Sequence, residues 1–132
     1  MSEVPHPSKD ILVVDDDAIM RDLICDWLVA AGYAVRKADD CHSAVAELGA
    51  SAPALVVSDL WMPGPRGAEA IRRLRQMHPQ VAVIAVSGHF GSGQGCSKRE
   101  AMQAGAARAF AKPVKRAELL GAVGELIGPP PK

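Results

Sequence analysis

Residues 11–17, Ile-Leu-Val-Val-Asp-Asp-Asp, join a short aliphatic run directly to three carboxylates. Such a run, bounded by polar residues, is typical of a strand buried on both faces of a parallel sheet. Three later apolar runs also end in reactive polar residues: 54–57 before Ser58 and Asp59, 81–86 before Ser87, and 109–111 before Lys112. The carboxyl ends of parallel strands meet at one edge of a sheet, where ligands bind. The sequence therefore predicts that Asp15, Asp16, Asp59, Ser87 and Lys112 form one site.

Strand-like and helix-like segments alternate along the rest of the chain. After the first run, apolar residues recur at helical spacing, with Asp17 placed to cap the helix and Gly32 to end it: Met20, Leu23, Ile24, Trp27, Leu28 and Ala31. Further helices are expected at about 43–49, around residues 70–74, at 98–104 and through 119–127, with a short strand at 34–35. Five strand–helix units with right-handed crossovers predict an α/β fold, a doubly wound parallel sheet of five strands with five helices.

Composition restricts the class of protein. The chain has 132 residues, enough for one domain, and 48% of them are hydrophobic but only 4% aromatic, which suits aliphatic parallel strands. Lys+Arg and Asp+Glu both number 15, so the net charge argues against general binding to nucleic acid or an anionic membrane. The three cysteines are widely spaced and predict neither a disulfide framework nor a zinc site.

The ends of the chain differ from its centre. Residues 1–8, which include Pro5 and Pro7, are expected to be a disordered lead-in, and residues 128–132 a Pro-rich tail that stops the last helix. Residues 9–127 then form the single domain. No signal peptide opens the chain and no apolar run reaches the ~18 residues of a membrane span, so a cytoplasmic location is expected.

The acidic residues predict a cation site. Two unpartnered carboxylates ~4–5 Å apart repel by roughly 3–4 kcal/mol at an effective dielectric of ~20, and Asp59 adds to the charge of Asp15 and Asp16. Ligation by oxygen alone favours Mg²⁺, which keeps several waters. The alternative is that acidic residues at a strand end only cap the next helix, as Asp17 is expected to do.

Asp59, Ser87 and Lys112 predict phosphoryl chemistry when taken together. A carboxylate can attack phosphorus when a cation and an ammonium neutralise the transferring oxygens. Lys112 can supply that ammonium, and its bond to Pro113 can be cis, which would fix the turn that presents the lysine. Ser87 can hydrogen-bond a phosphoryl oxygen. Each residue alone has an ordinary structural explanation, whereas the three at successive strand ends form a specific pattern.

Across residues 9–127 the chain resembles the response-regulator receiver domain of two-component signalling, as in stand-alone chemotaxis and cell-cycle regulators. The resemblance rests on ILVVDDD (11–17), VVSDLWMPGPRG (56–67), AVSG (85–88), AGA (104–106) and FAKP (110–113). It implies the flavodoxin-like strand order 2-1-3-4-5, with Mg²⁺ held by Asp15, Asp16, Asp59 and the backbone carbonyl of Trp61. Asp59 would accept phosphate, Ser87 would be the switch hydroxyl, and Lys112 would bond the phosphoryl group.

The same resemblance implies a signalling switch and not an enzyme, beyond self-phosphorylation from a phosphodonor and slow autodephosphorylation. The expected phosphate source is a sensor histidine kinase or a phosphotransfer protein. A downstream effector protein would bind the fourth and fifth helices, and the chain would be a monomer or weak dimer without direct contact to nucleic acid or membrane.

The chain departs from the family pattern at two places that matter for switching. The family usually has an aromatic residue three positions before the lysine, where this chain has Ala109, and Phe110 follows it. Arg66, preceded by Pro65, stands where Asp or Asn is common. Glycines at 91, 93 and 95 indicate a flexible connection, since they lack the Gly-Lys-Ser/Thr ending of a phosphate-binding loop.

Three other classes of protein share part of this pattern with the phosphorylated receiver. A haloacid-dehalogenase-type phosphatase could begin at Asp15, but it needs an acidic motif after the lysine, where only Glu118 and Glu125 follow inside a predicted helix. A flavodoxin needs a Ser/Thr/Gly-rich phosphate loop where the three consecutive aspartates stand. A degenerate receiver would act as an unphosphorylated interaction module, and the intact five-residue set favours the phosphorylated form.

Overall fold

A computed structural model describes residues 10–15, 17–38, 53–59, 66–88 and 98–129. Five parallel strands form one sheet in the order β2-β1-β3-β4-β5. The strands are β1 (Asp10–Val14), β2 (Ala34–Ala38), β3 (Leu55–Asp59), β4 (Ala82–Ser87) and β5 (Arg108–Ala111). The predicted α/β class, the doubly wound parallel sheet and the flavodoxin-like strand order are therefore confirmed.

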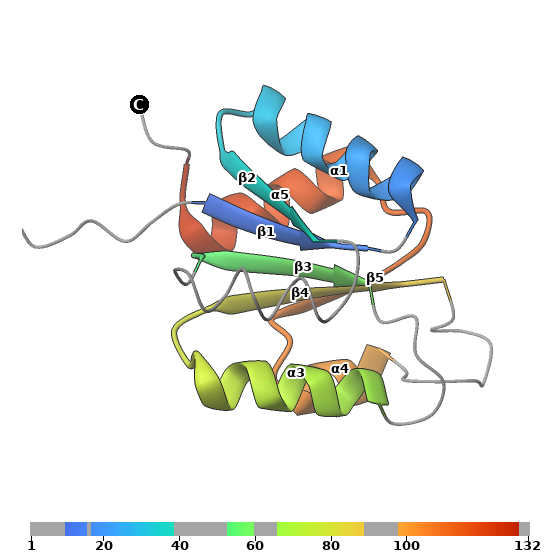
Figure 1. Ribbon diagram of the computed structural model, residues 1–132, viewed down its shortest axis with the longest axis vertical. Helices are drawn as coiled ribbons and strands as arrows, with labels where there is room; N and C mark the ends of the chain where they lie inside the picture. Colours follow the sequence, from blue (N-terminus) through green and yellow to red (C-terminus); the bar gives the residue numbers. More distant parts are fainter. Residues whose placement is uncertain (1–9, 16, 39–52, 60–65, 89–97, 130–132) are drawn as a thin grey trace, which may run out of the picture.

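Helices cover both faces of this sheet. The described helices are α1 (Ala18–Ala30), α3 (Arg66–Met77), α4 (Lys98–Ala104) and α5 (Arg116–Ile127). α1 and α5 lie on one face, and α3 and α4 on the other (Figure 1). The helix predicted at about 43–49 lies outside the described residues. In the part of the chain that the structure describes, no helix is long and apolar enough to cross a membrane.

The ends of the strands explain why polar residues collect at one edge. β3 and β4 run beyond their apolar runs, so that Asp59 and Ser87 are the last residues of these strands, while Asp15 and Lys112 directly follow β1 and β5. The parallel register aligns these ends, pairing Val14 with Ser58, Asp59 with Val86, and Ser87 with Ala111.

α1 begins as predicted, with Asp17 as its N-cap. The Asp17 Oδ1 atom accepts hydrogen bonds from the amides of Ile19 and Met20 at 3.0 and 3.3 Å, and Gly32 follows the helix with a φ of 105°. The predicted inward face is wrong at Leu23, which is 40% exposed, whereas Cys25 is buried. The apolar stripe of α1 is wider than the strip that contacts the sheet, so helical spacing alone did not identify its buried centre.

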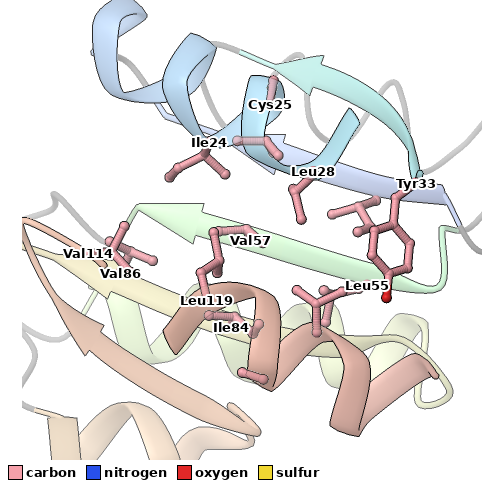
Figure 2. Packing of buried hydrophobic residues seen from close by; sticks show 14 residues of the cluster. Ile24, Cys25, Leu28, Tyr33, Leu55, Val57, Ile84, Val86, Val114 and Leu119 are labelled. Carbon is pink, nitrogen blue, oxygen red and sulfur yellow. The ribbon is translucent and has the colours of Figure 1, made fainter. Parts of the chain in front are cut away.

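The two faces of the sheet carry different cores. Large aliphatic side chains and Tyr33 fill the face under α1 and α5, with Leu119 of α5 against Ile84 of β4 (Figure 2). On the opposite face, α3 and α4 cover a cluster made mostly of alanines, together with Ile71 and Val83. A further aliphatic cluster lies beside it on that face and contains Leu12, Val14, Val56 and Val81. Phe110 packs against the cluster under α1 and α5, and Ala109 against the alanine-rich cluster, because successive side chains of a strand point to opposite faces.

Candidate functional site

One ammonium group joins two carboxylates at the carboxyl edge of the sheet. The Lys112 Nζ atom lies 3.1 Å from Oδ2 of Asp15 and 3.2 Å from Oδ2 of Asp59. The strand order places β4 between Lys112 and Asp59, so the lysine side chain extends across the end of that strand. The side chains of Asp15 and Asp59 are only 3% and 6% exposed. The fold thus brings three of the predicted site residues together, with both carboxylates buried and the lysine half-buried.

Asp15 is held by its backbone and by its side chain. Its amide donates a hydrogen bond to the carbonyl of Ala38, the last residue of β2, at 3.1 Å. Its Oδ1 atom accepts from the Asp17 amide at 2.9 Å, and its carbonyl oxygen accepts from Nη1 of Arg21 at 2.7 Å. The carboxylate therefore has one oxygen fixed by the following turn and the other directed at Lys112.

Asp59 carries an unfavourable negative charge. Burial first, and then the charge of Asp15, raise the pKa of its carboxyl from 3.8 to about 6, while Lys112 acts in the opposite direction. One ammonium shared between two buried carboxylates does not fully neutralise both. The Oδ1 atom of Asp59 is buried and has no hydrogen-bond partner among the described residues.

Lys112 remains a cation at this position. Burial lowers the pKa of its ammonium, but the hydrogen bond to Asp15 and the charges of both carboxylates outweigh burial and raise the pKa above its ordinary value. The Lys112–Pro113 peptide bond is cis, as the sequence allowed.

Ser87 and Lys112 are linked through the backbone. Ser87 is 1% exposed, and its carbonyl oxygen accepts a hydrogen bond of 2.9 Å from the Lys112 amide. The residue predicted to be the switch hydroxyl therefore sits next to the turn that presents the lysine.

The register of β4 and β5 shows whether Phe110 can replace the aromatic residue that the family usually has at the position of Ala109. Ala109 pairs with Ala85 and Phe110 with Val86 in the β4–β5 register. Ser87 lies two residues after Ala85, so it shares the α3/α4 face with Ala109. Phe110 packs on the opposite face, in the α1/α5 cluster. Phe110 therefore does not replace the missing ring beside Ser87.

Other predicted positions lie outside the described residues. These are Asp16, Trp61, Pro65 and the glycines at 91, 93 and 95, while Arg66 begins α3. Within the described ranges, no group of three or more His, Cys, Asp or Glu residues is placed to hold a metal. The two described carboxylates nevertheless suit Mg²⁺, because their donors are oxygens and Asp59 Oδ1 has no hydrogen-bond partner among the described residues. Burial, and then the charge of Asp15, raise the pKa of Asp59, and a bound cation would favour its ionised form.

Arg21 is the residue of this site that the sequence did not identify. It lies six positions after Asp15, in the first turn of α1, and contacts the Asp15 carbonyl. Its position in an amphipathic helix gave no sign that its side chain folds back over the helix start. Only its short separation from the acidic residues could have indicated it.

The fold and the cluster together define a receiver-type site, with acidic residues and a lysine at the carboxyl edge of a doubly wound sheet. The family model of the response regulator receiver domain matches residues 11–124. The chain belongs to this family, and its function is that of a phosphoacceptor in two-component signalling, a signalling switch.

Individual relatives agree with this assignment. The chain is 34% identical to the chemotaxis protein CheY of Bacillus subtilis over 118 residues, which cover 89% of this chain and 96% of CheY. It is 38% identical to the nitrogen assimilation regulatory protein NtrX of Azorhizobium caulinodans over 84 residues, 62% of this chain. The matched part spans only 18% of NtrX.

A solved structure is also similar. It is a response regulator protein from Burkholderia pseudomallei, with a phosphorylated aspartic acid, a calcium ion and citrate. It superposes with a TM-score of 0.75 and 25% identity, covering 88% of this chain and 66% of that one.

Proposed function

We propose that Asp59 is the phosphoacceptor, that Lys112 and Ser87 bind the transferred phosphoryl group, and that the reaction requires Mg²⁺. The observation that carries this proposal is the pair of contacts from Lys112 Nζ to Asp15 and Asp59, beside the Oδ1 atom of Asp59, which has no hydrogen-bond partner in the described part of the chain. The arrangement suits a site that gains a cation and a phosphoryl group.

The transfer step follows from these groups. An oxygen of the Asp59 carboxylate forms the new bond to phosphorus while the bond from phosphorus to the donor's nitrogen breaks. The donor histidine keeps that electron pair and takes up a proton. Lys112, which stays charged, donates hydrogen bonds to the phosphoryl oxygens, and the hydroxyl of Ser87 donates another.

The proposed metal ligands are Asp15, Asp16, Asp59 and the Trp61 carbonyl. Bound Mg²⁺ supplies positive charge against the phosphoryl oxygens. The Burkholderia pseudomallei regulator, whose structure has a phosphorylated aspartic acid and a calcium ion, supports a fold that takes both a phosphoryl group and a divalent cation. Burial of the Asp59 carboxyl and the nearby charge of Asp15, which together raise its pKa, support the same site here.

The bounds of the domain, the location of the protein and its partners are also proposed. The domain would span residues 9–127, with a disordered lead-in at 1–8 and a Pro-rich tail at 128–132. We propose a cytoplasmic location, a sensor histidine kinase or phosphotransfer protein as phosphate donor, and an effector protein that binds α4 and α5. The chain would be a monomer or weak dimer, would contact neither nucleic acid nor membrane, and would show no enzymatic turnover beyond its own phosphorylation and slow dephosphorylation.

Intact mass after incubation with acetyl phosphate and Mg²⁺ tests the phosphoacceptor. The wild type should gain the mass of one phosphate, and chelation of Mg²⁺ should prevent the gain. Asp59→Asn should remain unmodified, whereas Asp22→Asn, which removes an exposed carboxylate of α1 that pairs with Lys37, should be labelled like the wild type. Full labelling of Asp59→Asn would contradict the assignment, and an unlabelled wild type would favour an unphosphorylated interaction module.

The metal ligands are tested by Asp16→Ala. This change should weaken Mg²⁺ binding and raise the stability of the metal-free protein, because fewer like charges remain. Trp61, two positions after Asp59, should report binding by its fluorescence, measured in a Trp27→Phe background so that it is the sole tryptophan. Equal Mg²⁺ affinity with and without Asp16 would count against this ligand set.

A further inference from the structure

Arg21 makes a hydrogen bond that has no role in the phosphoryl transfer proposed above. Its Nη1 atom donates a hydrogen bond of 2.7 Å to the carbonyl oxygen of Asp15, while its own amide donates to the carbonyl of Asp17 at the start of α1. The side chain therefore folds back over the first turn of its helix and closes the connection between β1 and α1.

This contact completes the fixation of Asp15. The amide of Asp15 is bound to Ala38 of β2, and Oδ1 accepts from the Asp17 amide. Without Arg21, the carbonyl of Asp15 would lose its hydrogen bond, while the amide would keep the one to Ala38. The backbone at Asp15 would then be free to rotate. The Oδ2 atom that faces Lys112 depends on this orientation.

The hydrogen bond from Arg21 holds the carbonyl oxygen of Asp15 in one direction. A guanidinium suits this task because its donors are arranged in a rigid plane and it is charged at every physiological pH.

We propose that Arg21 is a positioning residue, which orients Asp15 so that its carboxylate faces Lys112 and the cation. The importance of this role for Mg²⁺ rests on the function proposed above. The orientation of Asp15 itself does not, and it can be measured in the metal-free protein.

Two possible roles of Arg21, as a nearby positive charge or as a residue that orients Asp15, predict opposite changes in Mg²⁺ affinity when Arg21 is replaced. If Arg21 acted only as a positive charge near a cation site, removing it would relieve repulsion and strengthen Mg²⁺ binding. If Arg21 positions Asp15, removing it should weaken binding about tenfold, the range found when a group that orients metal ligands is lost. The sign of the change separates the two explanations.

The variants are Arg21→Met, which keeps the aliphatic stem, and Arg21→Lys, which keeps the charge and one donor. The control is Lys37→Met, which removes a positive charge of β2 that pairs with Asp22. Lys37 and Arg21 both lower the pKa of the Cys25 thiol by their charge, so the two cations act on the same region of α1. All are made in the Trp27→Phe background, and urea unfolding establishes that each is folded.

Mg²⁺ titration followed by Trp61 fluorescence is the first measurement. Arg21→Met should raise the Kd for Mg²⁺ about tenfold, Arg21→Lys should raise it less, and Lys37→Met should leave it unchanged or slightly lower. An Arg21→Met protein that binds Mg²⁺ as tightly as the wild type, or more tightly, would overturn the proposal.

Amide hydrogen exchange without metal is the second measurement. The Asp17 amide, which donates to Asp15 Oδ1, should exchange faster in Arg21→Met, while the amide of Leu28, buried at the far end of α1, should be unaffected. Unchanged exchange at Asp17 would overturn the proposal. If the wild type does not bind Mg²⁺, the proposed function fails, and the Asp17 amide still decides whether Arg21 orients the turn.

Discussion

α5 and α4 lie on opposite faces of the sheet, and they are attached to it by very different side chains. α5 has 12 residues and buries Leu119, Ala122 and Val123. α4 has 7 residues and buries only Ala101 and Ala104. Figure 1 shows the two helices on either side of the strands that carry the site.

The difference in buried side chains indicates which of the two helices moves more easily. Burying a Leu or Val side chain contributes about 1.5–3 kcal/mol, whereas a buried methyl group contributes about 0.8 kcal/mol. α4 is therefore held weakly by comparison, and regions with few buried apolar contacts are those that open most easily. We expect α5 to act as a fixed support and α4 to respond when the charge of the site changes.

The ends of the two helices are held differently as well. After α5, the carbonyl of Gly128 accepts a hydrogen bond of 2.7 Å from the hydroxyl of Tyr33. After α4, Gly105 adopts a φ of 122° and lies against Arg75 of α3, so that a Cβ atom there would be 2.8 Å from Cγ of Arg75. The C-terminal ends of both helices are therefore held in place. The weak attachment of α4 comes from the small alanine side chains that it buries along its length.

The largest expected effect comes from truncating the side chains that attach each helix. Leu119→Ala should lower the free energy of unfolding by about 3–4 kcal/mol, because a fully buried side chain leaves a cavity. Ala101→Gly should cost only about 1 kcal/mol, largely through helix propensity. Urea unfolding measures both, and equal losses would break the comparison between α5 and α4.

The second expected effect is a pH dependence caused by Asp59. Because its pKa rises from 3.8 to about 6 on folding, the native protein keeps a proton that the unfolded chain has released between these pH values. The contribution of Asp59 to the stability of the metal-free protein should therefore fall as pH rises from about 4 through about 6, by roughly 2 kcal/mol after solvent screening is allowed for.

Urea unfolding over this pH range, in the presence of a chelator, gives the measurement. Asp59→Asn should remove the decline, whereas Asp22→Asn should retain it. Amide exchange at the same pH values should change more in α4 than in α5. Parallel curves for wild type and Asp59→Asn would mean that Asp59 is not the charged group responsible.

A smaller effect is expected at the glycine that ends α4. Gly105→Ala should cost about 1–2 kcal/mol, because a residue with a Cβ atom is strained at this φ and meets Arg75. Gly121→Ala is the matched change in α5, where nothing lies within 4 Å of the added Cβ atom. It should stabilise the protein by about 0.5–1 kcal/mol. A neutral Gly105→Ala would show that the end of α4 is not fixed as described.

The smallest effect is local and concerns the route of the signal. With beryllofluoride as phosphate mimic, amide exchange should change in α4 and in the loop before it, and little in α5. Ala109 has no ring to fill space beside Ser87, and Phe110 packs on the other face. Phe110→Leu should therefore leave the α4 response unaltered. Changes confined to β5 around residues 109 and 110 would contradict this route.

Much of the site could be predicted because its signals are local in the sequence. An aliphatic run followed by a polar residue marks the end of a buried strand, and this identified Asp15, Asp59, Ser87 and Lys112 as neighbours at one edge. The cap at Asp17 was equally local, since a short acidic side chain before a helix binds the first free amides. Helical spacing was less informative in α1, where it favoured Leu23 over Cys25.

Other features were decided only by the tertiary structure, because they depend on the relative placement of separate segments. The bridge from Lys112 to both carboxylates requires β5 to lie two strands from β3 with their ends aligned. The contact of Arg21 with Asp15 depends on the angle at which α1 leaves β1. The sequence by itself placed a ring at Phe110 next to Ala109; the register of β5 against β4 determined that this ring faces away from Ser87, since a shift of one residue reverses the side to which every strand residue points.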